Sequence, residues 1–266
     1  MNALQSEPAV VKIEGVPFIS LRLREVVSYI IRKHSEGCGG WVVTPNIDIL
    51  RRIMLDDSFR NLINTDTTLY TADGMPIVWV SYILGTPLPE RVAGSDIFVE
   101  LVAEAAQYGK SVYLLGGTPG VAEIAARMLQ EQFPDLWVTG FYAPPFGFEQ
   151  DPDEMAKIHQ LMATNRPDII FVGLGSPKQE QLIARLRTQL PNSWWLGIGV
   201  SFSFLTGDVK RAPVWMRKTG LEWFFRVLQE PRRLFKRYFI IGIPFAFRLF
   251  TRSLLRRAGF PPRIYL

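Results

Sequence analysis

The stretch SVYLLGGTPGVAEIAARMLQEQF at residues 111–133 decides the fold class. It opens with an apolar run of strand length, continues through a glycine-rich turn, and ends with apolar residues at helical spacing. A buried strand, a tight turn and a helix in that order form the repeating unit of a parallel sheet. The stretch therefore predicts an α/β protein whose sheet is covered by helices.

The same order recurs along the chain. The other strand and helix pairs are WVVT at 41–44 with IDILRRIM at 47–54, TTLYTA at 67–72 with PIVWVSYIL at 76–84, and DIIFVGLG at 168–175 with KQEQLIARLRTQL at 178–190, followed by the apolar run WWLGIGV at 194–200. We predict a Rossmann-like, mainly parallel sheet with flanking helices. Ligands of such sheets bind at the carboxyl ends of the strands, where Thr44, Asp73, Gly116 and Gly175 fall.

The charge balance reverses near the C-terminus. Residues from Val209 onward hold 14 Lys or Arg and 2 Asp or Glu, a net charge of +12, whereas residues 1–208 hold 16 and 23, a net charge of −7. Aromatic residues are interleaved with these cations, and this mixture is typical of a protein segment at the surface of an anionic bilayer. We predict an α/β body at 1–210 and a helical membrane-binding appendage at 211–266.

The appendage is expected to lie on the membrane and not to cross it. The apolar stretch from Tyr238 to Phe247 would span about 15 Å as a helix, about half of a hydrocarbon core, and Gly242 and Pro244 should break it. Two alternatives stay open: amphipathic helices packed on the body with a solvated basic face, and, ranked below it, a nucleic-acid surface. No recognisable nucleic-acid motif supports the second, so we expect no nucleic-acid partner.

Composition narrows the classes of site. Cys38 is the only cysteine and excludes an intrachain disulfide, and the opening MNALQSEPAV has no secretory-signal pattern, so we expect a cytoplasmic protein. His34 and His159 lie far apart in sequence, which supports neither a zinc site of ordinary spacing nor a Ser-His-Asp triad. We therefore expect no metal site and no cofactor.

The turn at Gly116 to Gly120 has two interpretations. Its backbone amides and the following helix suit a phosphate group, but glycines also permit a tight strand-to-helix connection. The turn departs from G-x-G-x-x-G, and no acidic residue follows the next apolar segment, LWVTG, which disfavours an NAD-dependent oxidoreductase. The Asp151-Pro152-Asp153 triplet imitates a metal-binding D-x-D motif, yet helix capping explains it better.

Polar residues follow three of the predicted strands. Asp73 and the Thr44-Pro45-Asn46 segment place a carboxylate, a hydroxyl and an amide at one sheet edge, although each is also a common helix cap. Gly175 is followed by Lys178, Gln179 and Glu180 in a first helical turn. A lysine there opposes the helix dipole, so we expect it to meet a ligand anion.

Read in order, the chain contains a series of distinctive motifs. They are TPNID, ADGMPIVW, GTPLPERVAGSD, VYLLGGTPGVAE, PDIIFVGLGSPKQE, GIGVSF, KRAPVWM and GLEWFFRVLQEPRR. The series resembles the WecG/TagA/CpsF family of bacterial glycosyltransferases from about Trp41 to Tyr238. The motifs are individually uncommon, and their order and spacing also agree with the family.

The resemblance implies transfer of a sugar from a UDP-sugar to a polyprenyl-diphosphate-linked saccharide at the cytoplasmic membrane face, with inversion and without a metal. It also implies roles for particular residues: Asp73 as catalytic base, Thr44, Asn46, Arg91 and Gln179 in the pocket, and Arg226 and Arg233 at the diphosphate. Gly116, Gly117, Gly175, Lys178 and Glu180 complete the predicted substrate-binding set. Arg232, Lys236 and Arg237 are expected to face lipid head groups or the acceptor's diphosphate.

Some questions stay open at this point. Val200 and Ser203 replace a glycine and an acid of the family's G-x-G-G-S-F-D pattern, so a donor preference different from that of the N-acetylmannosamine enzymes stays open if that loop contacts the nucleotide or the donor sugar. The segment beyond Tyr238 is interpreted as longer than the family's common end and as extra anchoring. A non-catalytic, membrane-associated nucleotide-binding or scaffolding protein is the alternative function, and a homo-oligomer is left open.

Overall fold

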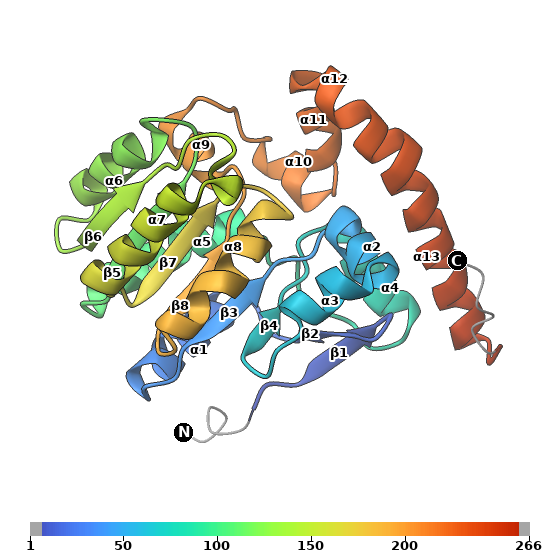
Figure 1. Ribbon diagram of the computed structural model, residues 1–266. Coiled ribbons are helices and arrows are strands. Elements are labelled where there is room, and N and C mark those ends of the chain that lie inside the picture. The colour runs from blue at the N-terminus through green and yellow to red at the C-terminus, as the bar shows by residue number, and fades with distance from the viewer. Residues whose placement is uncertain (1–6, 261–266) are drawn as a thin grey trace.

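An eight-stranded sheet runs through the molecule in the order β1-β2-β4-β3-β8-β7-β5-β6 (Figure 1). The structure is a computed structural model that describes residues 7–260, apart from the side chain of Lys218. The strands are β1 Val10–Ile13, β2 Val16–Ile19, β3 Gly40–Val43, β4 Thr68–Tyr70, β5 Ser111–Gly116, β6 Trp137–Tyr142, β7 Ile169–Gly173 and β8 Trp194–Gly197. Only the β1–β2 hairpin is antiparallel among these pairings, which confirms the predicted mainly parallel sheet.

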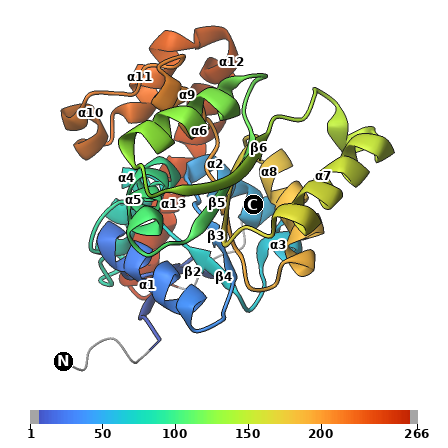
Figure 2. The ribbon, with the colours of Figure 1, turned by 90° about the vertical axis from the view of Figure 1, so that its left-hand side faces the viewer.

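Helices cover both faces of the sheet (Figure 2). They are α1 Leu23–Ser35, α2 Ile47–Leu55, α3 Asp57–Ile63, α4 Met75–Ile83, α5 Gly94–Gln107, α6 Val121–Gln132, α7 Pro152–Asn165, α8 Lys178–Leu186 and α9 Ser201–Thr206, with short 3-10 turns η1 Phe148–Gln150 and η2 Arg187–Gln189. Strand β3 shows why two cores form: Trp41 and Val43 join one buried cluster with α2, α4 and α8, while Val42 joins the other with α1 and α5. The helices predicted after four strands are confirmed as α2, α4, α6 and α8.

The chain after residue 210 is helical in its described part. Its elements are α10 Val214–Lys218, α11 Glu222–Gln229, α12 Pro231–Phe235, the π-helical η3 Lys236–Gly242 and α13 Ile243–Arg257. Figure 1 shows α10 to α12 at the same end of the molecule as α9, and α13 extending along the body beside α4. The predicted boundary at residue 210 stays a prediction.

The expected break at Gly242 and Pro244 is wrong. The helix continues from Pro231 to Arg257, 27 residues or about 40 Å, and by length and composition it is able to cross a membrane. Pro244 lies in the first turn of α13, directly after the π-helical segment, where the wider backbone turn accommodates a residue without an N–H donor. The helix is therefore continuous, although its uninterrupted apolar stretch between Arg237 and Arg248 is only ten residues long, and the expectation that it does not cross the membrane stays a prediction.

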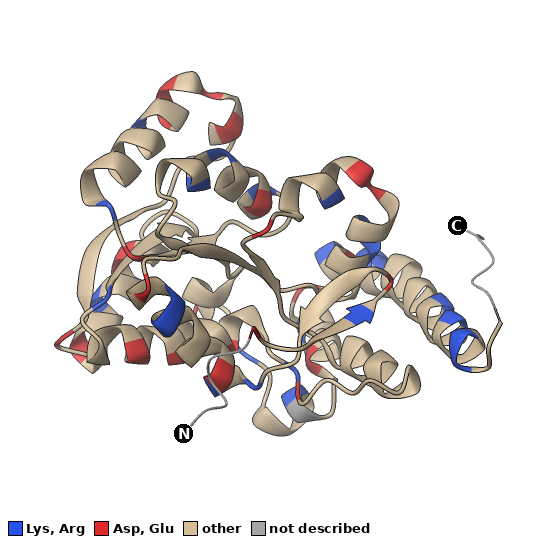
Figure 3. Cartoon of the chain, turned by 90° about the horizontal axis from the view of Figure 1, so that it is seen from below, with Lys and Arg blue, Asp and Glu red and all other residues tan. Residues whose placement is uncertain are grey.

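Helix α13 is attached to the body along its length. Leu249 is buried, and the ring of Phe250 lies 6.4 Å from that of Trp79 on α4. Further along, Arg252 and Arg256 form ion pairs of 3.0 and 3.2 Å with Glu14 in the β1–β2 turn. Figure 3 shows Lys and Arg along α13 and no Asp or Glu on it. The helix thus packs one side on the body and leaves its other sides exposed.

Candidate active site

Backbone hydrogen bonds join three loops at the carboxyl edge of the sheet. The Asp73 amide, after β4, donates to the Pro45 carbonyl, after β3, at 3.0 Å. The Val92 amide donates to the Ala72 carbonyl at 2.9 Å, which brings the segment before α5 to the same place. These bonds fix Asp73 and Arg91 next to one another.

Asp73 presents its carboxylate at this edge. Its Oδ1 lies 3.6 Å from a terminal nitrogen of Arg91, and 29% of its side chain remains exposed. Helix α4 begins after Gly74, and no side chain caps it. The alternative that Asp73 serves as a helix cap is therefore wrong, and its carboxylate pairs with Arg91 while remaining partly exposed to a ligand.

The surroundings of Asp73 change its acidity. Burial raises the pKa of Asp73 to about 7, opposed by the charge of Arg91 and assisted by the negative charges of Glu222 and Asp96. A carboxyl group with that pKa is present in both protonation states near neutral pH. Asp73 is thus suited to accept a proton under those conditions.

Asp73 belongs to a charge cluster, which we define as Asp73, Arg91, Asp96, Arg211, Arg217 and Glu222. Arg91 binds Asp96 and Glu222, each at 2.9 Å. Arg211 also binds Asp96, and it donates to the Ser95 hydroxyl at 2.7 Å. Because Glu222 lies on α11, the cluster ties the appendage to the body beside Asp73. Four of its members, Asp96, Arg211, Arg217 and Glu222, were not among the predicted site residues.

Thr44 and Asn46 follow β3 at the same edge. The side-chain oxygen of Asn46 accepts from the amides of Asp48 and Ile49 at 3.0 and 3.1 Å, so Asn46 caps α2. The capping alternative holds for Asn46, and its amide nitrogen is the group left for a ligand. Thr44 is buried against Gly94 at the start of α5.

The glycine turn after β5 makes a tight connection. Gly116 has a φ of +108°, and a Cβ there would lie 2.8 Å from the carbonyl oxygen of Gly173. The Gly117 amide donates to that carbonyl at 2.7 Å, so it is occupied and cannot also donate to a phosphate. Phosphate binding at this turn stays a prediction that rests on the amides after Gly117.

Lys178 follows Gly175 and opens α8. Its ammonium group pairs with Glu149 of η1 and lies 4.8 Å from the ring centre of Phe146. A protein carboxylate therefore meets the lysine that was expected to meet a ligand anion. The argument from the helix dipole loses its basis here, because Glu149 supplies the compensating charge.

Gln179 and Glu180 are buried behind the edge. The side-chain oxygen of Gln179 accepts from the Gly199 amide at 3.1 Å, and its nitrogen donates to Glu180 at 3.0 Å. Burial raises the pKa of Glu180, while its hydrogen bond from Gln179 lowers it. The pair thus holds the loop after β8, which contains Val200, at the edge of the site.

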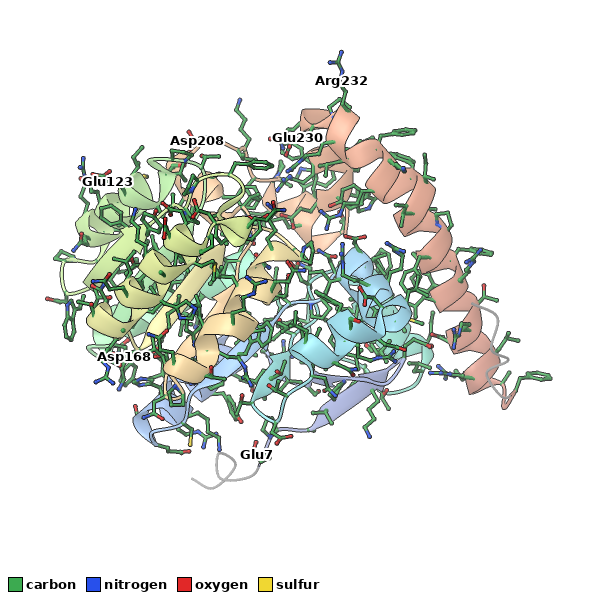
Figure 4. The ribbon with its side chains drawn as sticks, viewed as in Figure 1. Glu7, Glu123, Asp168, Asp208, Glu230 and Arg232 are labelled. Carbon is green, nitrogen blue, oxygen red and sulfur yellow. The ribbon has the colours of Figure 1, made fainter. Side chains whose placement is uncertain are left out.

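The predicted diphosphate ligands lie on α11 and α12. Arg226 and Arg233 both bind Glu230, at 3.1 and 2.7 Å, and the Arg226 guanidinium lies 5.2 Å from the ring centre of Phe204. Figure 4 shows Arg232 pointing away from the rest of the molecule.

Arg237 of η3 forms an ion pair with the body. It pairs with Asp48 at 3.1 Å, so η3 is fixed to the first turn of α2. The expected role of Arg237 stays a prediction, and in this structure its guanidinium group is paired with Asp48. Next to it, burial raises the pKa of Tyr238, and the charge of Asp73 acts in the same direction.

The family model for the Glycosyl transferase WecG/TagA/CpsF family matches residues 11–259. The chain belongs to this family. Because the match extends to residue 259, the family's common length includes most of the segment beyond Tyr238. The interpretation of that segment as an extension is therefore wrong.

Curated relatives agree with the WecG/TagA/CpsF assignment. The chain is 30% identical over 223 residues to a protein of Bacillus subtilis strain 168, and the aligned region covers 83% of this chain and 84% of the relative. It is 31% identical over 232 residues to a protein of Staphylococcus aureus strain MW2, and the aligned region covers 86% of this chain and 89% of the relative. Both relatives are named N-acetylglucosaminyldiphosphoundecaprenol N-acetyl-beta-D-mannosaminyltransferase.

Membership in the WecG/TagA/CpsF family makes this protein a glycosyltransferase. The oxidoreductase and the non-catalytic scaffold, which the sequence left as alternatives, are superseded by it. In a transferase, an accessible carboxylate that ionises near neutral pH is suited to deprotonate an attacking hydroxyl group. Within the charge cluster, Asp73 is the carboxylate whose pKa is raised, and 29% of its side chain is exposed.

Proposed function

We propose that this protein is an inverting, metal-independent glycosyltransferase that moves a sugar from a UDP-sugar to a polyprenyl-diphosphate-linked saccharide. The observation that carries the proposal is the Asp73 carboxylate, whose pKa is raised to about 7 and which lies 3.6 Å from Arg91 at the carboxyl edge of the sheet. The names of the relatives supply the acceptor class, because they act on a lipid-linked diphosphate saccharide.

The proposed reaction is a single displacement. Asp73 accepts the proton of the acceptor hydroxyl while the hydroxyl oxygen forms a bond to the anomeric carbon of the donor sugar. The bond from that carbon to the UDP oxygen breaks, and UDP leaves with the electron pair. Attack from the face opposite the leaving group inverts the anomeric carbon. The β linkage in the names of the relatives is consistent with inversion of an α-linked donor.

Positive charge is needed where UDP leaves. The diphosphate gains negative charge in the transition state, and guanidinium groups stabilise it through paired hydrogen bonds. Arg226 and Arg233 share Glu230 in this structure, so in the proposal they exchange that carboxylate for the diphosphate when the donor binds. Within residues 7–260, no group of three His, Cys, Asp or Glu side chains is arranged to hold a metal ion.

In this proposal the enzyme is located at the cytoplasmic face of the membrane. The helix from α12 to α13 leaves large apolar side chains exposed, among them Phe235, Ile240, Phe247 and Leu254, and its charged residues after Glu230 are all basic. Exposed apolar groups next to Arg and Lys bind the interface of an anionic bilayer. This arrangement supports a peripheral attachment that places the site beside the lipid-linked acceptor.

A donor screen tests the proposed function. Purified protein is incubated with a panel of UDP-sugars and a diphosphate-linked N-acetylglucosamine that carries an isoprenyl chain, and UDP release is measured. We expect acceptor-dependent release with one UDP-N-acetylhexosamine, with UDP-N-acetylmannosamine as the first to test because of the names of the relatives. The absence of acceptor-dependent release across the whole panel would contradict the proposal.

Chelation tests the metal independence. We expect an excess of EDTA to leave the rate of transfer unchanged, because the arginine side chains stabilise the leaving diphosphate in the proposed mechanism. The initial rate of UDP release is measured with untreated protein, and again after the protein has been treated with EDTA and exchanged into metal-free buffer. A loss of activity that Mn²⁺ or Mg²⁺ restores would show that a divalent ion takes part.

A further inference from the structure

An open cavity of about 620 Å³ lies between α4 and α10, next to the charge cluster. Its walls are largely apolar and come from Val78, Trp79 and Tyr82 on α4 and Val214 on α10. Its volume is within the range of sites that bind organic ligands. We call this cavity the α4–α10 groove.

The inner end of the groove is formed by Arg91, Asp96 and Arg217, and Arg91 also lies 3.6 Å from Asp73. The groove therefore begins beside the proposed catalytic base. A ligand that fills its inner end lies next to the carboxylate that would accept the proton.

Arg217 is the group at this end that is available to an anion. Asp96 is already bound by Arg91, Arg211 and Arg217, and the remaining acid of the lining, Glu90, accepts from the Leu23 amide at 2.6 Å. Arg217 makes only a 3.4 Å contact with Asp96, and its buried Nε has no partner among residues 7–260. The guanidinium group of Arg217 thus keeps donors for an anionic ligand.

The outer end of the groove favours an apolar ligand. Trp79, Tyr82 and Val214 are 42%, 56% and 54% exposed. Trp79 also contacts Phe250 of α13, so the wall of the groove continues into the helix that carries the exposed apolar side chains. A groove that offers the Arg217 guanidinium group at its inner end and is apolar toward the exposed helix α13 matches a ligand with a phosphate head and a hydrocarbon chain.

We propose that the α4–α10 groove binds the diphosphate and the first isoprene units of the polyprenyl-diphosphate acceptor. The diphosphate lies against Arg217 and Arg91, the isoprene units lie along Trp79, Tyr82 and Val214, and the saccharide extends toward Asp73. The identity of the ligand as an acceptor rests on the proposed function, but its binding is measurable without transfer.

Farnesyl diphosphate is the probe for the groove, and its affinity for the full-length protein is measured by titration calorimetry. We expect it to bind at least about 10²-fold more tightly than inorganic pyrophosphate, since burial of a few CH₂ groups at about 0.8 kcal/mol each supplies that factor. Tyr82→Glu combined with Val214→Glu should lower the affinity for farnesyl diphosphate by about 10-fold or more. Both side chains are exposed, so the fold should persist, as circular dichroism will show.

The matched control is Ile124→Glu combined with Met128→Glu on α6, at side chains that are 49% and 37% exposed and are not part of the groove lining. It should bind farnesyl diphosphate as the unchanged protein does. Unchanged affinity in the Tyr82 and Val214 double variant would overturn the groove proposal, as would equal loss in the Ile124 and Met128 control.

Transfer assays separate this proposal from the proposed function. If no UDP-sugar supports transfer but the Tyr82 and Val214 double variant alone loses farnesyl diphosphate, the groove stands and the function fails. If transfer occurs and the double variant keeps the KM of the unchanged protein for the isoprenyl acceptor, the function stands and the groove fails.

Discussion

Replacing Asp73 by Asn should lower the rate of sugar transfer by about 10²- to 10⁴-fold, the usual effect of removing a general base. Asparagine has the shape of aspartate and keeps an oxygen for Arg91, but it cannot accept the proton of the acceptor hydroxyl. UDP binding should stay close to that of the unchanged protein, because Asp73 does not contact the donor diphosphate in the proposed mechanism. The measurements are kcat from UDP release and the Kd of UDP.

The pH profile gives an independent readout of the same residue. Since the pKa of Asp73 in the ligand-free protein is raised to about 7 and the ionised form is active, kcat/KM should fall as the pH decreases through about 7. The residual rate of Asp73→Asn should lack this inflection. Turnover near that of the unchanged protein, or the same inflection in the variant, would remove Asp73 from the mechanism.

Stability should change in the opposite direction to activity. The folded state raises the pKa of Asp73, so it holds the proton more tightly than the unfolded state, and the ionised carboxylate destabilises the fold as the pH rises from about 4 to about 7. Above pH 7, the free energy of unfolding of Asp73→Asn should therefore exceed that of the unchanged protein by on the order of 2 kcal/mol, after allowance for the partial exposure of Asp73. The variant should accordingly unfold at a higher temperature. Below pH 4 the difference should vanish, because the carboxyl group is then protonated in both states. This measurement also shows that a loss of activity does not reflect a loss of fold.

The fold was largely predictable because its strands are buried on both faces. The runs that became β3, β5, β7 and β8 are continuously apolar, and every residue of these strands is buried. The β1–β2 hairpin gave a weaker signal, since β1 alternates exposed and buried residues over only four positions. The continuous helix through Gly242 and Pro244 was not predictable from local preferences, because contacts with α4 and Glu14 hold it.

The site was predictable where local motifs carry it. Asp73 follows a strand end, and the family's motifs single it out, whereas the charge cluster depends on residues far apart in sequence. Arg91 and Glu222, for example, are separated by 131 positions. The same limit explains Lys178: its position in α8 was visible in the sequence, but its partner Glu149 lies in a different loop. Sequence patterns identify groups at strand ends, and the tertiary fold decides what neutralises them.

Replacing both Phe247 and Leu254 by Glu should release the protein from vesicles that contain anionic lipid. These side chains are 71% and 56% exposed on α13, between arginines that attract the same lipids. Losing the insertion of two large apolar side chains costs about 3 kcal/mol in total at partial burial, or about 10²-fold in vesicle affinity. The two new carboxylates add repulsion from the anionic surface. Co-sedimentation with vesicles measures the effect.

The consequence for catalysis separates membrane attachment from chemistry. The double variant should lose transfer to an acceptor embedded in vesicles, yet keep transfer to a short-chain acceptor in solution, because Phe247 and Leu254 lie outside the charge cluster and the groove lining. Ile124→Glu combined with Met128→Glu on α6 is the matched control, since it adds the same charge at exposed apolar positions of another helix. That control should stay on the vesicles. If the α13 variant also stays, or if it loses both transfer reactions equally, α13 does not act as the membrane attachment.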